Sequence, residues 1–122
     1  MEDRFNTLPR RLREVSFEQE IEGVPCLIVK PDNVPRPFLF WMHGRTAHKE
    51  LDAGRYLRCA RQGINVCAVD LPGHGERFVE ADQEATRILP IIEQMLEEID
   101  GVISGLASLG GFDITNAALG GM

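Results

Sequence analysis

The residues best suited to chemistry follow a short apolar run. His43, Gly44, Arg45 and Thr46 come directly after five unbroken apolar residues, Phe38–Met42. A run without polar alternation is typical of a strand buried on both faces, as in the centre of a parallel sheet. Ligands of an open α/β sheet bind beyond the carboxyl ends of such strands. The pattern therefore predicts that these four residues border a binding site.

A second apolar run, Ile64–Val69, is interrupted only by Asn65 and leads into the segment Asp70–Arg77. Two glycines and a proline in this segment predict a compact loop. A His/Asp pair could act as a general base only within hydrogen-bond reach of a nucleophile, and no candidate nucleophile accompanies this one. We interpret Asp70 as a turn residue and His74 as a residue that shapes the loop, with a substrate contact as the alternative for His74.

The remaining reactive side chains are interpreted as structural. His43 is expected to fix its loop through its ring nitrogens, and His48 to lie exposed at a helix start. Three cysteines, Cys26, Cys59 and Cys67, have no metal-ligand spacing, and we interpret them as reduced thiols of a cytoplasmic protein. No metal and no organic cofactor are expected.

Composition indicates one small globular domain without an obvious macromolecular ligand. The chain has 122 residues, of which 43% are apolar and 26% charged, with a formal net charge of -6. A negative charge argues against nucleic acid or an anionic membrane as the main partner. No run reaches the roughly 18 apolar residues of a membrane span. The charged start of the chain differs from a signal peptide.

The first third of the chain predicts an arm and an edge hairpin. Residues 1–13 are polar and charged and are expected to pack as an arm over the sheet edge. Residues 14–30 contain two apolar strand patterns around the turn signal Glu22-Gly23, which predicts an antiparallel hairpin at one edge of the sheet. Residues 31–37, with three prolines, are expected to form a loop.

The rest of the chain, residues 38–122, reads as alternating strands and helices. Thr46–Gly63 predicts a helix with a loose stripe of Leu51, Leu57 and Ala60, so that the two apolar runs become parallel strands joined by a right-handed crossover. Further along, apolar residues recur at spacings of three and four, which predicts a long helix over Leu89–Leu109 after a looser lead-in over residues 81–88. A short third parallel strand is expected over Thr115–Leu119.

This order of elements and two motifs resemble the N-terminal half of an α/β-hydrolase. The motifs are His43-Gly44 after the first strand and Asp-x-Pro-Gly-His-Gly, residues 70–75, after the second. The chain is most similar to small bacterial esterases related to dienelactone hydrolases and to the catalytic domain of prolyl oligopeptidases. The resemblance covers nearly the whole chain from Glu14. It implies a mostly parallel sheet with an antiparallel edge hairpin, in which residues 1–122 form the first half of a single domain.

The resemblance also implies where the catalytic groups lie. The nucleophile of the family sits in G-x-S-x-G, and Gly121 and Met122 match the first two positions, so a serine is expected next. The acid and the histidine would then belong to the C-terminal half of the domain, the expected partner of this chain. The backbone N–H of Arg45 would be one oxyanion donor, and Gly44 would let the backbone approach a substrate. The Arg45 side chain is expected to be free to line the acyl or alcohol pocket.

The implied activity is hydrolysis of a small-molecule carboxylic ester by acyl transfer through a serine. A peptidase, a thioesterase or a lactone hydrolase remains open, and an aspartate nucleophile would make the protein a dehalogenase. A different class is a non-catalytic remnant of the fold that binds a partner through an unpaired sheet edge. A nucleotide-binding domain is disfavoured because the loop after Gly44 lacks the G-x-G-x-x-G fingerprint.

Overall fold

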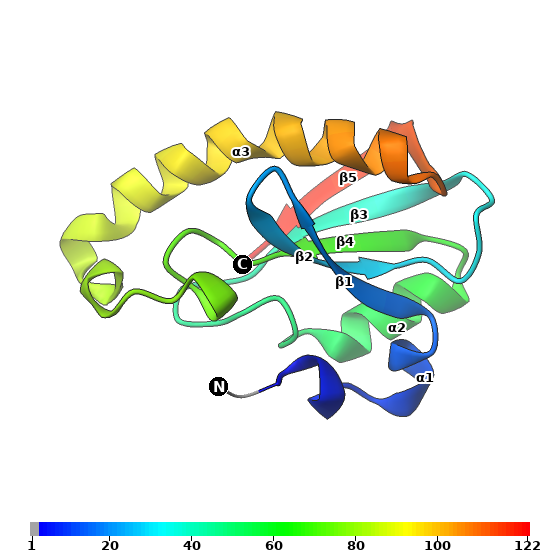
Figure 1. Ribbon diagram of the computed structural model, residues 1–122, viewed down its shortest axis with the longest axis horizontal. Coiled ribbons are helices and arrows are strands. Elements are labelled where there is room, and N and C mark those ends of the chain that lie inside the picture. The colour runs from blue at the N-terminus through cyan, green and yellow to red at the C-terminus, as the bar shows by residue number, and fades with distance from the viewer. Residues whose placement is uncertain (1–2) are drawn as a thin grey trace.

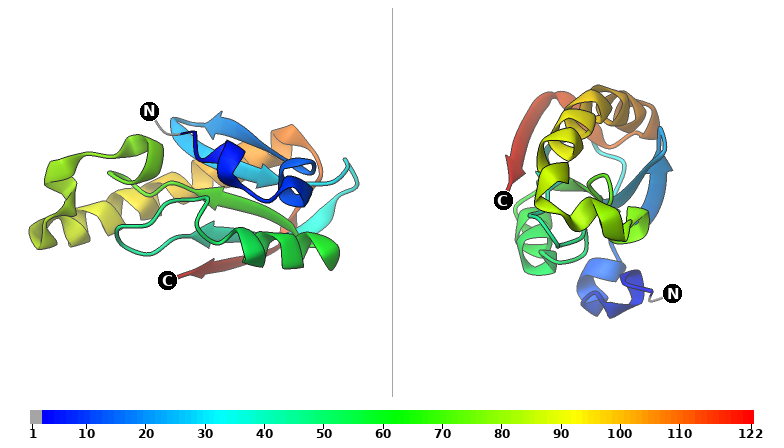
Figure 2. Two further views of the ribbon diagram at one scale, coloured as in Figure 1. Left: turned by 90° about the horizontal axis from the view of Figure 1, so that it is seen from below. Right: turned by 90° about the vertical axis from the view of Figure 1, so that its left-hand side faces the viewer.

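A computed structural model describes residues 3–122 and shows a five-stranded sheet between two helical layers (Figure 1). The strand order is β1-β2-β4-β3-β5. Helix α3 (Ile88–Leu109) covers one face, and the short α1 (Arg10–Arg13) and α2 (Ala53–Arg61) cover the other, as the end-on view of Figure 2 also shows. None of the described helices is long and apolar enough to cross a membrane.

The predicted edge hairpin is confirmed. Strands β1 (Ser16–Ile21) and β2 (Val24–Val29) pair antiparallel, and β2 then pairs antiparallel with β4. The connecting residues Glu22 and Gly23 have φ values of 50° and 78°, so both lie in the left-handed region that a tight two-residue hairpin turn requires. The hairpin leaves β1 as one edge of the sheet.

The three predicted parallel strands are also confirmed. Strand β3 (Arg36–Met42) lies between β4 (Asn65–Val69) and β5 (Phe112–Gly121) and runs parallel to both. Strand β5 starts three residues earlier than Thr115 and ends two residues after Leu119, because its pairing with β3 continues to the register Met42–Gly121. The carboxyl ends of β3, β4 and β5 therefore meet at one edge of the sheet.

Burial on both faces of the sheet explains the unbroken apolar runs. Phe38 and Phe40 of β3 pack in one cluster with Val102 and Leu106 of α3. Trp41, on the opposite side of the same strand, belongs to a second cluster. The members of that cluster on β4, α2 and the N-terminal segment include Val66, Ala68, Tyr56, Leu8 and Leu12.

The segment before α2 differs from the prediction. The helix starts at Ala53, and residues 46–52 form a loop with a turn over residues 49–52 in place of the expected helix. Leu51, expected on the buried stripe, is 60% exposed and was wrongly assigned to the helix. Tyr56 is the helix residue that is fully buried, and its hydroxyl donates to the carbonyl of Lys49 at 2.8 Å. The contacts of Lys49 with Tyr56 and Asp70 therefore hold this segment in a loop, although its sequence has some helical spacing.

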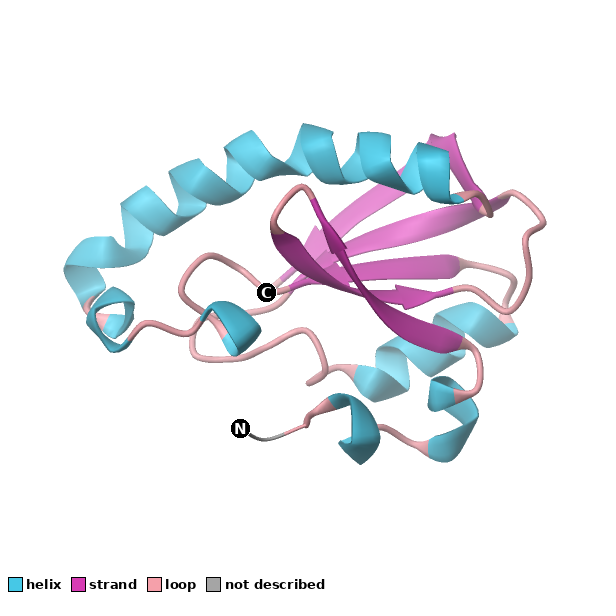
Figure 3. Cartoon of the chain, in the orientation of Figure 1, coloured by secondary structure: helices cyan, strands magenta, loops and turns pink. Residues whose placement is uncertain are grey.

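Helix α3 agrees closely with the prediction of Leu89–Leu109. The looser lead-in forms two 3-10 turns, Glu80–Gln83 and Ala85–Arg87, which Figure 3 shows as a small coil at the N-terminal end of α3. The N-terminal part of α3 extends past the carboxyl ends of the strands (Figure 1). It therefore stands beside the sheet edge where a site was predicted.

Two glycines of α3 test how closely this helix packs on the hairpin. An added Cβ at Gly105 would overlap the side chain of Ile21, whereas at Gly101 it would meet Glu22 Cγ at 3.4 Å. Gly101→Ala should raise the free energy of unfolding by about 1 kcal/mol through helix propensity. Gly105→Ala should make the protein less stable than the wild type, because overpacking costs about 1–3 kcal/mol. Urea unfolding of both variants checks this, and equal stabilisation of the two would contradict the packing of α3 on β1.

Candidate active site

The ring of His43 anchors the loop that follows β3. This ring is buried, its Nε2 accepts a hydrogen bond from the N–H of Leu71 at 3.1 Å, and its Nδ1 lies 2.8 Å from the Gly44 carbonyl oxygen. Because Nε2 accepts from a backbone N–H, the ring proton resides on Nδ1, which donates it to the carbonyl. His43 thus joins the loop after β3 to the loop after β4.

The environment keeps this ring neutral. Burial lowers the pKa of His43 below its ordinary value of 6.5, and the hydrogen bond to Gly44 and the charge of Asp70 only partly oppose that effect. A protonated ring could not accept the hydrogen bond from Leu71. Both ring nitrogens are already used, so the arrangement suits a loop-holding role for His43 better than that of a general base.

Lys49 is fully buried among carboxylates. Its Nζ donates to Asp70 at 3.0 Å and to Glu76 at 2.8 Å, and lies 2.9 Å from a Glu50 oxygen and 3.8 Å from Glu18 of β1. Burial opposes the charge of Lys49, but the hydrogen bond to Glu76 and the attraction of Asp70 outweigh it and raise the pKa of Lys49 above its ordinary value. A permanent ammonium therefore balances part of the negative charge at this point.

Asp70 links the same two loops through the backbone. Its Oδ1 accepts from the N–H of Lys49 at 2.9 Å and its Oδ2 from the N–H of Glu76 at 3.1 Å, which agrees with the predicted turn role. Gly75, at φ 56°, lies so close that a Cβ there would overlap the Asp70 carboxylate. Glycine is needed at this position both for its φ and for the close approach.

Arg45 and Thr46 occupy the exposed part of the loop after β3. The guanidinium of Arg45 donates to the carbonyl of Gln83, so the side chain is not free, in contrast to the prediction. Thr46 has a φ of 65°, which is uncommon for a β-branched residue, and its hydroxyl donates to the Arg45 carbonyl at 2.6 Å. Within residues 3–122 the backbone N–H of Arg45 donates to no protein group. It is therefore available to a ligand.

The carboxyl end of β5 reaches the same loop. The N–H of Met122 donates to the carbonyl of Met42 at 3.2 Å, which extends the pairing of β5 with β3. A Cβ placed on Gly44 would lie 3.5 Å from the Cβ of Met122. Gly121 and Met122, the two elbow-adjacent residues of the sequence analysis, thus lie beside His43-Gly44-Arg45.

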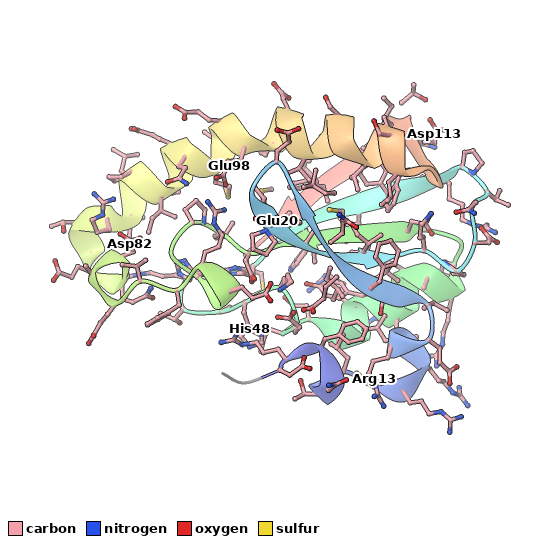
Figure 4. All side chains as sticks on the ribbon, viewed as in Figure 1. Arg13, Glu20, His48, Asp82, Glu98 and Asp113 are labelled. Carbon is pink, nitrogen blue, oxygen red and sulfur yellow. The ribbon has the colours of Figure 1, made fainter. Side chains whose placement is uncertain are left out.

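A cavity of about 390 Å³ opens where these segments meet. It is enclosed by the ends of β3 and β5, the loop after β4 and the N-terminal part of α3. Asp82, labelled in Figure 4 near the start of α3, borders it as well. The other lining residues used below are Arg45, His74, Met122, Leu71, Ile91 and Met95. Most of these side chains are apolar, so the cavity suits an uncharged organic group.

His74 is buried at the wall of this cavity. Its Nδ1 lies 2.9 Å from the carbonyl oxygen of Pro72, and its ring centroid lies 5.3 Å from that of His43. The bond to Pro72 closes the Pro-Gly-His-Gly turn on itself, which is a loop-shaping contact. The other nitrogen, Nε2, has no hydrogen-bond partner within the described residues.

The sequence analysis did not predict the burial of Lys49 or the pairing of Arg77 with Glu98. Arg77 forms a bidentate ion pair with Glu98 of α3, labelled in Figure 4, at 2.8 and 2.7 Å. The hydrogen bond to Arg77 helps to lower the pKa of Glu98 against the opposing effect of burial. Between residues 3 and 122 no group of His, Cys, Asp or Glu side chains is arranged to hold a metal ion.

Comparison with known proteins finds similarity in solved structures. No family model and no curated protein matches the sequence. A cold-adapted esterase from an Arctic intertidal metagenomic library is 21% identical with a TM-score of 0.65, and the match covers 87% of this chain and 48% of the esterase. A Klebsiella pneumoniae protein assigned as a dienelactone hydrolase is 19% identical with a TM-score of 0.69, over 88% of this chain and 49% of that one.

A third solved structure, TT1662 from Thermus thermophilus, is 20% identical with a TM-score of 0.62, over 87% of this chain and 45% of its own. This chain therefore spans about half the length of the solved structures that it matches. Similarity at this level of identity concerns the fold, and the chemistry of the site has to be argued from the residues of this chain.

The buried ion pair between Lys49 and Asp70 supplies a stability test. Lys49→Met would leave buried carboxylates without their cation and should lower the free energy of unfolding by about 3–5 kcal/mol. Because the pKa of Lys49 is raised, the contribution of this pair is fully present below the ordinary value of 10.5 and is lost only as the pH rises through the higher folded value. Urea unfolding at pH 7 is the measurement.

Arg10→Met is the matched control, since it removes a cation from the exposed pair with Glu14. That change should hardly alter stability, because exposed pairs contribute little. Similar small losses in Lys49→Met and Arg10→Met would mean that the Lys49 cluster does not hold the two loops together.

Proposed function

We propose that this chain, which has the fold of the N-terminal half of an α/β-hydrolase, carries the oxyanion loop of a serine hydrolase that cleaves carboxylic esters. The nucleophile would be a serine directly after Met122. The histidine and the acid of the triad would come from the C-terminal half of the same domain. Both the ester specificity and the serine are proposals, argued below from this chain's residues.

The observation that carries the proposal is the unpaired N–H of Arg45. It belongs to the loop that borders the cavity, and Gly121 and Met122 line the same cavity from the end of β5. A nucleophile on the residue after Met122 would stand beside this N–H. An oxyanion hole needs such fixed backbone donors where negative charge develops, and needs them next to the attacking oxygen.

The proposed reaction runs in two steps. The serine Oγ attacks the ester carbonyl carbon while a histidine accepts its proton, and the carbonyl oxygen becomes an oxyanion that accepts a hydrogen bond from the Arg45 N–H. When the oxyanion collapses, the alcohol leaves with the proton and an acyl-enzyme forms. A water molecule, deprotonated by the same histidine, then attacks the acyl-enzyme, and the acid is released as the serine regains its proton. Arg45 would contribute through its backbone alone, and its side chain would brace the loop through Gln83.

The cavity favours a neutral, partly apolar ester. Leu71, Ile91 and Met95 line it and make its surface mostly apolar. A thioester or a lactone presents the same kind of carbonyl and remains within this proposal. A peptidase would need in addition a way to hold an extended chain, for which the residues described here offer no specific support.

The proposed partner of the chain is the second half of its domain. Strand β5 pairs only with β3 within the described sheet, and Ile114 and Leu119 on it are exposed. An open edge with apolar side chains is suited to pairing with a further strand. The three free cysteines are compatible with the reducing cytoplasm that we propose as the location.

Substitutions at Arg45 separate its backbone from its side chain. In the full-length protein, Arg45→Ala should keep most activity on a neutral aryl acetate, because the N–H survives. Arg45→Pro removes the donor and should lower kcat by roughly two or more orders of magnitude. The measurement is the turnover of the aryl acetate by both variants.

Thermal unfolding of the two variants serves as the control for damage to the loop, and Arg45→Pro should unfold close to Arg45→Ala. Equal and mild losses of turnover would remove the Arg45 N–H from the oxyanion hole. A large loss in Arg45→Ala would assign the role to the side chain.

A further inference from the structure

Strand β1 is a free edge of the sheet, at the opposite end of the strand order from β5. The second half of the domain, which we propose to join at β5, therefore leaves β1 uncovered. β1 pairs with β2 in a regular register over all six residues of Ser16–Ile21, with neither a bulge nor a proline nor a lysine in it. Such features often prevent an edge from pairing with a further strand. This edge is therefore open to an added strand.

The backbone of every second residue of β1 points out from this edge. Just before β1, the N–H of Lys30 donates to the carbonyl of Val15 at 2.9 Å. Bonded pairs of an antiparallel hairpin alternate from such a pair, so Gln19 bonds to β2 while Glu18 and Glu20 face outwards. Within residues 3–122 no carbonyl outside the sheet accepts the N–H groups of these two glutamates. Both groups are available to a partner.

The charge beside this edge is negative. Side chains of alternate residues share one face of a strand, so those of Glu18 and Glu20 lie together, and with Glu76 they line a groove of about 340 Å³. The ammonium of Lys49 is shared among four carboxylates, including those of Glu18 and Glu76. Partial burial raises the pKa of the Glu18 carboxyl despite the attraction of Lys49, so this carboxylate would be stabilised by a further cation.

A second groove lies on the opposite face of β1. Ile21 packs against α3 and lines this groove of about 350 Å³, which Gly105 and Leu109 also border. Residues of an added strand would alternate between the two grooves. Basic side chains at every second position would face Glu18 and Glu20, and the residues between them would face α3. A second copy of β1 fits this edge poorly, because its own glutamates would come close to these two.

We propose that the edge of β1 binds an extended segment of another protein with basic side chains at alternate positions, and that this segment joins the sheet as a further strand. The N–H groups of Glu18 and Glu20 would donate to carbonyls of the segment, and their carboxylates would pair with its basic groups. None of the glutamates at this edge lines the cavity of the candidate active site, so the inference stands apart from the esterase function.

The probe is a blocked, fluorescein-labelled octapeptide in which arginine and valine alternate, and its control has the same composition with the four arginines grouped together. Fluorescence anisotropy with the full-length protein should show roughly tenfold tighter binding of the alternating peptide, because only there do two basic groups face the two glutamates. Glu20→Lys should weaken that binding roughly tenfold, since an attractive pair across the strands becomes repulsive. Glu20 is labelled in Figure 4.

Glu93→Lys is the matched control, because Glu93 is exposed on α3 and the change in charge is the same. It should alter the affinity by less than about threefold, through the overall charge alone. Equal affinity for the two peptides, or equal effects of Glu20→Lys and Glu93→Lys, would overturn the inference.

Hydrogen exchange of backbone amides, followed by NMR on the full-length protein, distinguishes an added strand from a loosely attracted cation. The alternating peptide should slow exchange at the N–H groups of Glu18 and Glu20 and leave that of Gln19, already paired with β2, nearly unchanged. Unchanged exchange at both glutamates would overturn the inference. Slow exchange there without peptide, together with dimerisation in analytical ultracentrifugation, would assign the edge to a second copy and overturn it as well.

Discussion

The buried ammonium of Lys49 holds the two loops of the site in one position, and most of the local geometry follows from it. Its Nζ and its backbone N–H both reach Asp70, at 3.0 and 2.9 Å, and Asp70 also accepts from the N–H of Glu76. A buried lysine is tolerated only with carboxylates around it, and removing either partner leaves an uncompensated charge. The loop after β3 and the loop after β4 are therefore fixed together before any ligand arrives.

Much of the fold could be predicted because its central strands are buried on both faces. Phe38–Met42 and Ile64–Val69 have almost no polar residue, a pattern that a strand with one wet face would not show. Strand β5 was predicted too short. Its exposed residues do not alternate regularly between apolar and polar types, and its length is set by pairing with β3. The start of α2 was wrong for a related reason. The contact between Lys49 and Asp70, 21 residues apart, overrides the local helical spacing that included Leu51.

The place of the site was easier to predict than its chemistry. The rule that ligands bind beyond the carboxyl ends of parallel strands selected His43–Thr46, and of these residues His43 and Arg45 line one cavity together with His74 and Met122. The sequence could not show that Gln83 holds the Arg45 guanidinium or that Nε2 of His74 is left without a donor. The first is a contact between residues 38 positions apart and the second is the lack of any contact, and no local sequence pattern indicates either.

The central claim is that the Arg45 N–H is a donor to the reacting oxygen, and a crystal structure of the full-length protein inhibited by a phosphonate tests it most directly. A phosphonate ester bonded to the nucleophile copies the tetrahedral intermediate and places one oxygen in the oxyanion hole. We expect the adduct on the residue after Met122, with its phosphonyl oxygen about 2.7–3.1 Å from the backbone nitrogen of Arg45. An adduct on another residue, or a phosphonyl oxygen bound by other donors and out of reach of Arg45, would contradict the account.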